Sequence, residues 1–417
     1  MMRTLPEWLE WQEKLHLSSI DLGLDRIRVV AERLDLLNLP FPVISVAGTN
    51  GKGSTVAFLH AILSAQGYKT GAYTTPHIVD YNERISIEGK PLSDEKICQA
   101  FERINQVRGD ISLTYFEFGT LAAVLCFVDQ GVDVAILEVG LGGRLDAVNL
   151  WDADLALITT IAIDHVDWLG DDREVIGREK AGIMRKGKPV VCGEPSPPRS
   201  ISLVANEQGA ELLQYTQDYS YQVSADSWQW EGLGLLYKKL PLPSLQGDYQ
   251  IQNVAMVIAG LSCLDIDINE SSIRKGLKTA YVAGRLQKLQ SSPEILLDVA
   301  HNAQAAQQLA KYLQKNKIKG KTRAIFSILS DKDVESVVLS MRFSIDEWHI
   351  VSLDDPRAIP IEQLKLQLEQ LRLETVTSYN NFDSVLKSVK SLSTHNDRLV
   401  IFGSFLVVSG VMSVSSG

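Results

Sequence analysis

A glycine-rich stretch, VAGTNGKGST at Val46–Thr55, carries residue types that can bind the phosphates of a nucleotide. Its three glycines allow close approach and left-handed torsions of the backbone, so that successive N–H groups can converge on phosphate oxygens. Lys52 can reach the β- and γ-phosphates, and Ser54 or Thr55 offers a hydroxyl for magnesium. The common loop places the hydroxyl residue directly after the lysine, whereas here Gly53 separates them. Taken alone, the stretch is either an unusual nucleotide loop or a glycine-rich turn with a solvated lysine.

Polar side chains also follow several apolar runs that are typical of buried strands. The carboxyl ends of parallel strands share the edge at which open α/β sheets bind ligands, so these side chains are candidates for a metal or nucleotide site. Carboxylate and hydroxyl oxygens suit magnesium, and a neutral imidazole can bind a metal. The candidates are Thr74, Thr75, His77, Glu138, Asp164, His165 and Asp167. Glu138, at the end of an apolar run, is the most informative; TTPH and His165, each taken alone, are more often ordinary strand-exit residues.

A similar group lies in the second half of the chain. The stretch LDVAHNAQA places Asp298, His301 and Asn302 after another predicted strand. Arg285 in GRLQ and Asn253 on a predicted helix are further polar candidates, which we expect to face a cleft between domains. Each of these residues alone is a weak indication.

The elements that must position these residues alternate between strands and helices. FPVISVAG predicts a strand that enters the glycine loop, and TVAFLHAILSAQGYK predicts the amphipathic helix after it, starting near Ser54. Further apolar runs end in TTPH, EVGLGG and IAIDH, with helical patterns between them. Buried strands that alternate with helices indicate a parallel, doubly wound α/β sheet. Before it, Glu7–Leu37 has helix-like spacing with an interruption around Gly23.

The pattern changes near Pro195. The stretch Tyr219–Pro243 contains short aromatic-rich runs typical of an antiparallel flap, and YQIQNVAMVIAGLSCL predicts a helix after it. The strand–helix alternation then restarts with EILLDVAHN, RAIFSIL, WHIVSL and RLVIFGS. We therefore predict two α/β domains with a boundary near Leu286–Pro293.

The composition fits a soluble globular protein, with 417 residues, 45% hydrophobic and 22% charged. A net charge of −10 argues against broad nucleic-acid binding, which needs an electropositive face, but not against ATP. The four cysteines stand far apart, which suits a reducing compartment. No signal-peptide core is present at the N-terminus, and the apolar runs Leu121–Val128 and Leu399–Val414 are too short or too interrupted to span a membrane. We expect a cytoplasmic protein without nucleic-acid or membrane partners.

Together these stretches resemble the folylpolyglutamate synthases and, within that family, the bifunctional bacterial dihydrofolate synthases/folylpolyglutamate synthases of the Mur ligase superfamily. The resemblance runs in order from Asp21 to Phe405, nearly the whole chain. The matching stretches are DLGLDR, VAGTNGKGST, TTPH, LTYFEFGTLAA, EVGLGGRLDAVN, ITTIAIDHVDWLG, IGREKAGI, GRLQ, LDVAHN and FGSF. A glycine after the lysine is this family's form of the loop, so the resemblance implies an ATP loop.

The resemblance implies an ATP-dependent amide ligase. A pteroate or folyl carboxylate attacks the γ-phosphate, giving an acyl phosphate and ADP, and the amine of L-glutamate then displaces phosphate. The acceptors would be 7,8-dihydropteroate, giving dihydrofolate, and tetrahydrofolates, giving polyglutamates. The resemblance also implies a monomer with its active site in a cleft. The cleft would lie between a phosphate-loop domain of doubly wound type, 1–288, which binds ATP and folate, and a smaller Rossmann-like domain, 289–417.

The resemblance assigns the site residues in four overlapping sets. The ATP-binding set is Gly48, Thr49, Asn50, Gly51, Lys52, Gly53, Ser54, Asn253, Arg285, Asp298 and His301, the last four from across the cleft. The folate-side set is Asp21, Leu22, Gly23, Leu24, Thr114, Tyr115, Phe116, Glu117, Leu145, Asp146 and Ala147. The magnesium ligands would be Ser54, Thr75, Glu138, His165 and Lys180, and the catalytic residues Lys52, Glu138, His165 and Lys180. Thr75 stands where many relatives have serine, which keeps the hydroxyl.

Lys180 is expected to bind magnesium only in a modified form. In IGREKAGI, beside Glu179, it has the ordinary interpretation of a solvated helical lysine. The family resemblance instead places it near the metal, where a bare ammonium would be repelled. A neutral lysine amine can take up carbon dioxide and become a carbamate, whose two oxygens suit magnesium. We therefore hypothesise that Lys180 is carbamylated.

Three other functions stay open. A monofunctional folylpolyglutamate synthase would have the same ATP motifs. A Mur ligase of cell-wall synthesis usually has a UDP-binding domain before the loop, and 47 residues before Gly48 are too few for one. A regulatory nucleotide-binding protein would not need the second polar cluster. The length of polyglutamate added and the preferred folate are not set by the sequence.

Overall fold

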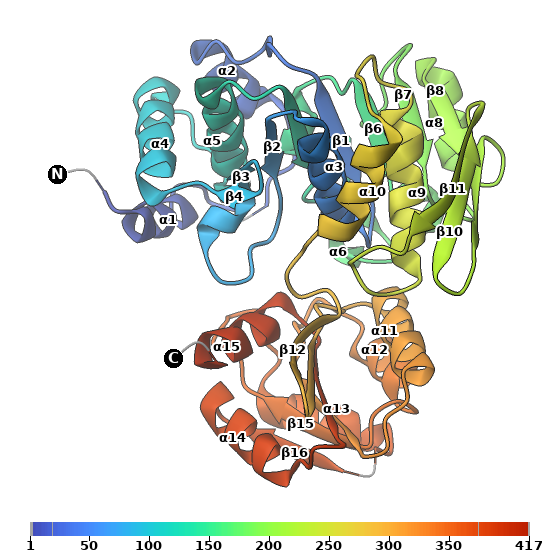
Figure 1. The fold of residues 1–417 in the computed structure, drawn as a ribbon. Coiled ribbons are helices and arrows are strands. Elements are labelled where there is room, and N and C mark those ends of the chain that lie inside the picture. The colour runs from blue at the N-terminus through green and yellow to red at the C-terminus, as the bar shows by residue number, and fades with distance from the viewer. Residues whose placement is uncertain (1–2, 19, 374, 416–417) are drawn as a thin grey trace. The chain divides into compact units, whose positions relative to one another are not determined.

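The computed structural model describes residues 3–18, 20–373 and 375–415 and forms two compact units (Figure 1). The first unit comprises Met1–Ile163, Leu169–Ser244 and Ile251–Tyr281. The second comprises Asp164–Trp168, Leu245–Gln250 and Val282–Gly417. Residues 164–168, 245–250 and 282–288 thus group with the second unit, whereas the predicted domains, 1–288 and 289–417, place them in the first.

The first unit is built on an eight-stranded sheet in the order β4-β3-β2-β5-β1-β6-β7-β8. The strands are β1 Val43–Ala47, β2 Thr70–Tyr73, β3 Ile85–Ile87, β4 Lys90–Pro91, β5 Val134–Glu138, β6 Leu155–Ile158, β7 Pro189–Cys192 and β8 Glu211–Gln214. From β2 to β8 all neighbours run parallel, and only the edge strands β3 and β4 are antiparallel. Every residue of β1, β2, β5 and β6 is buried, as expected for parallel strands covered on both faces.

Helices cover both faces of this sheet, because right-handed crossovers that move in opposite directions along a sheet place their helices on opposite faces. The helical elements are α1 Leu5–Glu13, α2 Asp25–Arg33, α3 Lys52–Gln66, η1 Tyr81–Arg84, α4 Asp94–Arg108, α5 Tyr115–Gln130, η2 Ala147–Leu150, α7 Arg173–Ala181, α8 Arg199–Gln208, α9 Tyr249–Leu261 and α10 Glu270–Thr279. The short helix α6, Val166–Leu169, follows the exit of β6. The predicted single interruption around Gly23 is wider in the structure, from the end of α1 to Asp25.

A three-stranded antiparallel sheet completes the first unit, as predicted for the aromatic-rich stretch. Its strands are β9 Tyr219–Val223, β10 Ser227–Gly232 and β11 Leu235–Pro241. Trp228 and Trp230 of β10 are buried, and each indole N–H donates to a backbone carbonyl.

The second unit is a six-stranded sheet in the order β12-β13-β17-β14-β15-β16. The strands are β12 Gln287–Ser291, β13 Glu294–Leu297, β14 Thr322–Phe326, β15 Glu347–Val351, β16 Val376–Tyr379 and β17 Arg398–Phe402. The helices are α11 Ala303–Lys315, α12 Val334–Met341, α13 Ile361–Gln370, α14 Phe382–Leu392 and α15 Phe405–Ser415. Only β12 is antiparallel to its neighbour. The predicted class, two α/β units with largely parallel sheets, is confirmed.

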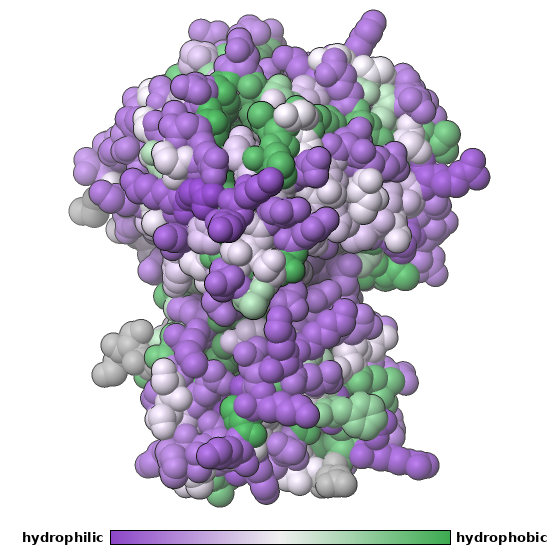
Figure 2. Space-filling model, turned by 45° about the vertical axis from the view of Figure 1, so that its right-hand side comes forward, coloured by the Kyte–Doolittle hydropathy of each residue, from purple (hydrophilic) through white to green (hydrophobic). Residues whose placement is uncertain are grey.

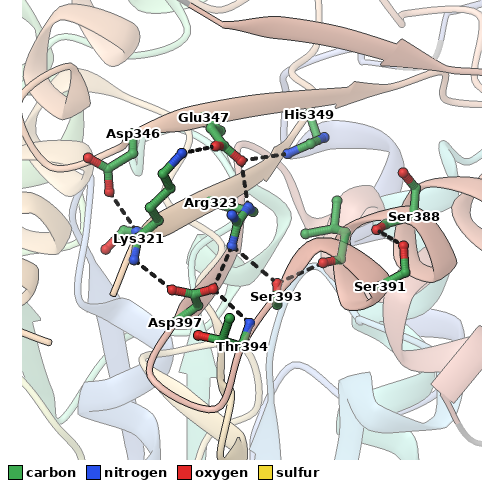
Figure 3. A network of polar contacts seen from close by, with 12 residues as sticks. Lys321, Arg323, Asp346, Glu347, His349, Ser388, Ser391, Ser393, Thr394 and Asp397 are labelled. Atoms are coloured by element: carbon green, nitrogen blue, oxygen red, sulfur yellow. Dashed lines mark hydrogen bonds and ion pairs between the residues drawn. The ribbon is translucent and has the colours of Figure 1, made fainter. Parts of the chain in front are cut away.

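The second unit also contains a polar network at the beginning of β14, β15 and β17 (Figure 3). The buried guanidinium of Arg323 donates to Glu347 at 2.5 Å and to Asp397 at 2.9 Å. Asp397 also accepts the N–H groups of Lys321 and Thr394, each at 2.7 Å. The pairing and the hydrogen bonds offset the desolvation of these buried charges, and they join the beginnings of three strands.

The surface and the cysteines agree with the composition. The face in Figure 2 is mostly hydrophilic, with hydrophobic residues in smaller groups. All four cysteines are free thiols. Among the described residues, no helix has the length and apolarity needed to cross a membrane. The run Leu121–Val128 lies inside α5, and Leu399–Val414 is divided between β17 and α15.

Candidate active site

The loop between β1 and α3 has a backbone that requires glycine at two positions. Gly48 has φ of +150° and Gly51 has φ of +91°. A Cβ added to Gly48 would lie 1.8 Å from the Thr159 hydroxyl oxygen, so no other residue fits there without a shift of the backbone. Gly53 differs, because it lies in the first turn of α3; the predicted left-handed torsion is wrong at this position.

Two threonines at the exit of β6 hold this loop. Thr160 accepts the Asn50 N–H at its hydroxyl, 3.1 Å away, and its carbonyl accepts the Thr49 N–H at 2.7 Å. The Thr159 hydroxyl donates to the Asn50 carbonyl at 2.6 Å. The sequence analysis quoted these threonines but assigned them no role. The sequence feature that could have indicated this role is their place directly after a predicted strand. Because β6 pairs in parallel with β1, the residues that follow β6 lie beside the loop that follows β1.

Lys52 and Asn253 both lie against the loop. The Lys52 ammonium donates to the carbonyls of Gly48, at 3.0 Å, and Thr49, at 3.2 Å. Asn253, on α9, is buried, and a Cβ on Gly51 would lie 2.8 Å from its side-chain oxygen. Asn253 therefore belongs to the same unit as the loop, and the prediction that it approaches from across a cleft is wrong.

Glu138 and Thr75 come together at the same edge of the sheet. Glu138 is the last residue of β5 and is buried, and the Thr75 N–H points to its carboxylate oxygen at 3.3 Å. The two residues meet because β2 and β5 are parallel neighbours, with Tyr73 opposite Leu137. With Ser54 in the first turn of α3, this edge offers hydroxyl and carboxylate oxygens of the kind that magnesium prefers.

A tight loop follows Glu138 and is closed by Asp146. The Asp146 carboxylate accepts the N–H groups of Gly140 at 3.1 Å, Leu141 at 2.8 Å and Val148 at 3.0 Å. Burial raises the pKa of Asp146 to about 6, although these hydrogen bonds and the Lys52 charge oppose the increase. The influence of Lys52 shows that this loop and the glycine loop are electrostatic neighbours.

The same loop packs against the helix that carries Lys180. The Arg144 N–H donates to the Glu179 carbonyl at 2.9 Å, and a Cβ on Gly143 would lie 3.0 Å from the Lys180 backbone. The Lys180 side chain is only 4% exposed. The ordinary interpretation of a solvated lysine is therefore wrong. Burial of a lysine next to a loop of the candidate site is unusual unless the group has a partner or a modified form.

Two of the folate-side segments are joined by a residue that the sequence analysis did not select. Arg26 on α2 donates to the Asp21 carboxylate at 2.6 Å and lies 3.3 Å from the carboxylate of Glu117. His16 adds a contact to Asp21 at 3.1 Å. Thr114 and Glu117 cap α5 reciprocally, which fixes this segment. Arg26 is the last residue of the quoted segment DLGLDR, so its place two residues after the selected Leu24 was the available signal.

The third folate-side segment lies near the second through an aromatic contact. A Cβ on Gly140 would lie 2.7 Å from the ring of Phe116, so the loop closed by Asp146 passes directly beside this ring. Phe116 also packs on Tyr73, with ring centroids 5.9 Å apart. These contacts, with the Gly140–Asp146 hydrogen bond, bring Thr114–Glu117 and Leu145–Ala147 into one neighbourhood.

His77, at the exit of β2, is held neutral. Burial first, and the charge of Arg84 second, lower the pKa of His77 to about 4. Its Nδ1 accepts the Arg84 Nε–H at 2.8 Å. His77 therefore orients Arg84 rather than carrying charge itself.

The remaining selected residues form a cluster within the second unit. Asp164 accepts from Lys332 at 2.7 Å and from Asn302 at 3.1 Å, and the His301 ring lies 3.6 Å away. Burial opposes ionisation of Asp164, but the contacts with His301 and Lys332 lower its pKa well below the usual range. His165 follows Asp164 with φ of +53°, a left-handed backbone. Lys332 was missed, because it lies far along the chain from every motif.

Asp298 and Arg285 are also structural neighbours in this unit. The Asp298 carboxylate accepts the N–H groups of Leu286 and Ala300, both at 2.9 Å. Burial raises its pKa, and the charge of Arg285 acts in the opposite direction. Arg285 also lies over the Phe405 ring, 5.9 Å from its centroid.

The structure thus divides the selected residues by unit. The loop residues 48–54 and Thr75, Glu138, Lys180 and Asn253 lie in the first, with all three folate-side segments. His165, Arg285, Asp298 and His301 lie in the second. Within the described parts of the chain, no group of three or more histidine, cysteine, aspartate or glutamate side chains forms a metal centre.

Two family models match this chain. The Mur ligase middle domain matches residues 46–260, and the Mur ligase glutamate ligase domain matches residues 284–405. The dihydrofolate synthase/folylpolyglutamate synthase of Escherichia coli (strain K12) is 42% identical over 417 aligned residues, covering 98% of this chain and 95% of that protein. The protein of the same name from Haemophilus influenzae is 40% identical over 431, covering 98% and 97%.

Solved structures agree with these relatives. E. coli FolC in complex with DHPP and ADP superposes with a TM-score of 0.95 at 41% identity, covering 99% of this chain and 98% of that chain. The bifunctional enzyme from Yersinia pestis complexed with AMPPNP and Mn ion gives a TM-score of 0.93 at 42% identity, covering 100% and 98%. The chain therefore belongs to the dihydrofolate synthase/folylpolyglutamate synthase family of Mur ligases.

Proposed function

We propose that this chain joins L-glutamate to 7,8-dihydropteroate and to tetrahydrofolates in an ATP-dependent reaction through an acyl phosphate. One observation carries the proposal: the glycine loop, the Thr75–Glu138 pair and the folate-side segments all belong to one compact unit. Relatives crystallised with DHPP, ADP or AMPPNP support it. A monofunctional folylpolyglutamate synthase is the alternative, and relatives that are named for both activities favour use of both acceptors.

In this proposal the chain positions the phosphates of ATP. The N–H groups of residues 48–54 and the positive end of α3 bind phosphate oxygens. Lys52 exchanges its contacts with the loop carbonyls for the γ-phosphate, where its charge stabilises the transferring group. Asn253 supports the loop from α9.

The oxygens of Ser54, Thr75 and Glu138 fit a magnesium ion, and His165 completes the proposed ligand set. When bound, magnesium neutralises charge on the phosphate oxygens. Two contacts of the chain position the Glu138 carboxylate. The Thr75 N–H donates to one of its oxygens, and the place of Glu138 at the end of β5 fixes its backbone. Arg285, Asp298 and His301 are proposed to contact the nucleotide from the domain 289–417 and the segment before it.

Lys180 is proposed to be a carbamate. Its burial at 4% exposure and its place beside the loop that follows Glu138 support a modified, oxygen-bearing side chain. Lys180→Ala should lose activity that short carboxylic acids partly restore, whereas Lys180→Arg should stay inactive. Nuclear magnetic resonance after incubation with ¹³C-bicarbonate should show a carbamate signal in the wild type and none in Lys180→Ala. A wild type without that signal, and with activity independent of bicarbonate, would reject the modification.

The activity itself is tested by ADP release. Purified protein is assayed with L-glutamate, ATP and magnesium, and either dihydropteroate or tetrahydrofolate as acceptor. We expect glutamate-dependent ADP release with both. Release with tetrahydrofolate alone would assign the monofunctional alternative, and release only with a UDP-linked muramyl substrate would overturn the proposal.

The accompanying proposals concern the state of the protein. We propose a cytoplasmic monomer, supported by the resemblance and by the free cysteines. Sedimentation of the purified protein should give the mass of one chain, 46.1 kDa.

A further inference from the structure

Arg84 is placed between the proposed metal side and folate side of the first unit. It is the last residue of η1 and is half-buried. Its guanidinium carbon lies 5.5 Å from the ring centroid of Tyr81 and 5.4 Å from that of Tyr115. The two rings are perpendicular, at 89°, and form two walls beside the cation. Tyr115 begins the folate-side segment, and His77, which accepts the Arg84 Nε–H, lies two residues after Thr75.

The charge of Arg84 has no carboxylate partner in the described ranges of the chain. No aspartate or glutamate oxygen there lies within the 4.0 Å ion-pair distance of its nitrogens. Some half-buried arginines do have one: Arg26 pairs with Asp21, and Arg185 pairs with Asp152. Arg84 is therefore a half-buried cation whose balancing anion is not supplied locally.

The nearest acid in sequence is already used. The Glu83 carboxylate accepts the N–H groups of Ile78 at 2.8 Å, Val79 at 2.8 Å and Asp80 at 2.9 Å. These bonds hold the turn that precedes Arg84, so Glu83 cannot turn toward the guanidinium without losing them. The neighbouring His77 presents a neutral acceptor rather than an anion.

The two acceptors differ in just the group that such a cation would bind. Dihydropteroate carries one carboxylate, and that carboxylate reacts. Tetrahydrofolate carries a glutamyl tail with two, one of which reacts while the α-carboxylate stays charged. We propose that Arg84 binds this α-carboxylate and so determines the use of tetrahydrofolate relative to dihydropteroate. The inference rests on the proposed function and adds a specificity residue to it.

The incoming L-glutamate also has carboxylates, but two observations favour the folate tail. Arg84 contacts Tyr115 of the folate-side segment, so a ligand held there meets the guanidinium directly. The family model named for glutamate ligation matches residues 284–405, far from Arg84 in the chain. The planar fork of arginine suits a carboxylate, and the two aromatic rings lie beside the guanidinium on two sides.

The test compares both acceptors in Arg84→Met, Arg84→Lys and the wild type. For Arg84→Met we expect the KM for tetrahydrofolate to rise about 10- to 100-fold, the scale of a lost charge-assisted hydrogen bond, with the KM for dihydropteroate and for ATP nearly unchanged. Arg84→Lys should recover part of the loss, because a cation without the fork remains. Arg108→Met is the matched control: Arg108 also covers an aromatic ring, Trp11 at 5.2 Å, and has no proposed ligand.

A second arm varies the ligand, so that its main comparison is made on the wild type and does not depend on a variant that folds. Equilibrium binding of tetrahydrofolate is compared with binding of its α-carboxamide, in which the charge is removed. The wild type should bind the amide at least 10-fold more weakly, and Arg84→Met should bind both alike. Equal loss for both acceptors, a raised KM for L-glutamate instead, or an amide bound as well as the acid would each overturn the inference. If the wild-type protein is inactive with both acceptors, that result would instead contradict the proposed function.

Discussion

Lys52 illustrates how one residue can be held ready for a ligand. Its ammonium bonds to two carbonyls of its own loop, and its charge reaches the Asp146 loop. If the Lys52 ammonium moves to a phosphate, it exchanges neutral carbonyl acceptors for a charged one. This stabilises the nucleotide most when negative charge develops on the phosphoryl group that is transferred.

At this residue we predict that Lys52→Ala lowers kcat by roughly two or more orders of magnitude, the scale of a lost preorganised charge contact. The melting temperature should change little, because the described hydrogen bonds of the side chain go to carbonyls of its own loop. Rates of ADP release and a thermal melt measure the two effects. Lys186→Ala, on the exposed surface, is the control. Near-normal turnover of Lys52→Ala would return the loop to a simple glycine-rich turn.

At the scale of elements, α2 and α5 depend on one arginine for their polar connection. Arg26 reaches Asp21 before α2 and Glu117 in the first turn of α5, and the Glu117 side chain is only 3% exposed. Removing the guanidinium leaves a buried carboxylate without its cation, which costs more than the ion pair itself contributes.

We therefore predict that Arg26→Met raises the KM for both acceptors and destabilises the first unit by about 1–3 kcal/mol. The KM for ATP should change much less, since Arg26 makes no contact with the glycine loop in its described bonds. Steady-state kinetics and urea unfolding test this, with Arg28→Met on the exposed side of α2 as the matched control. Equal effects on ATP and folate would indicate general damage to the unit.

At the scale of the whole molecule, the second unit has its own electrostatic requirement. Its network joins Arg323 to Glu347 and Asp397 across three strands (Figure 3). Burial acts to raise the pKa of both acids, but hydrogen bonds outweigh it and lower both pKa values. Glu347 accepts hydrogen bonds from Lys321 and Arg323. Asp397 accepts them from the N–H groups of Thr394 and Lys321 and from Arg323. A carboxyl with a lowered folded-state pKa stabilises the fold above its unfolded pKa, and this stabilisation disappears as pH falls toward the folded value.

We predict that the second unit loses stability progressively below about pH 4.5, where unfolded carboxyl groups begin to take up protons, while remaining unaffected between pH 6 and 8 by these two groups. Hydrogen exchange of β14 and β17, corrected for intrinsic rates, reports this unit separately. Asp397→Asn should lower protection at pH 7 and flatten the acid dependence, whereas Asp383→Asn, an exposed acid at the start of α14, should do neither. An unchanged acid profile in Asp397→Asn would show that the network is not the cause.

The order of elements and most of the first unit's ligand edge could be read from the sequence. The strand into the glycine loop, the Glu138 strand and the restart after residue 293 follow from hydrophobic runs, which are local properties of the chain. The short strands β3, β4, β7, β8, β12 and β16 were not predicted, because they carry little periodic signal. The family resemblance, in turn, depended on motifs that are also local.

Tertiary structure alone decided which residues meet. Thr159 and Thr160 brace the loop because β6 pairs with β1, and Asn253 reaches Gly51 only because α9 packs back on the first unit. Lys180 is buried because the Gly143 turn lies against its helix. Contacts with residues that are distant in the sequence also place three further side chains: Arg26, Arg84 and Lys332. Such contacts follow from strand order and helix packing, so the sequence determined the types of residue available for the chemistry and the tertiary fold decided which of them became neighbours.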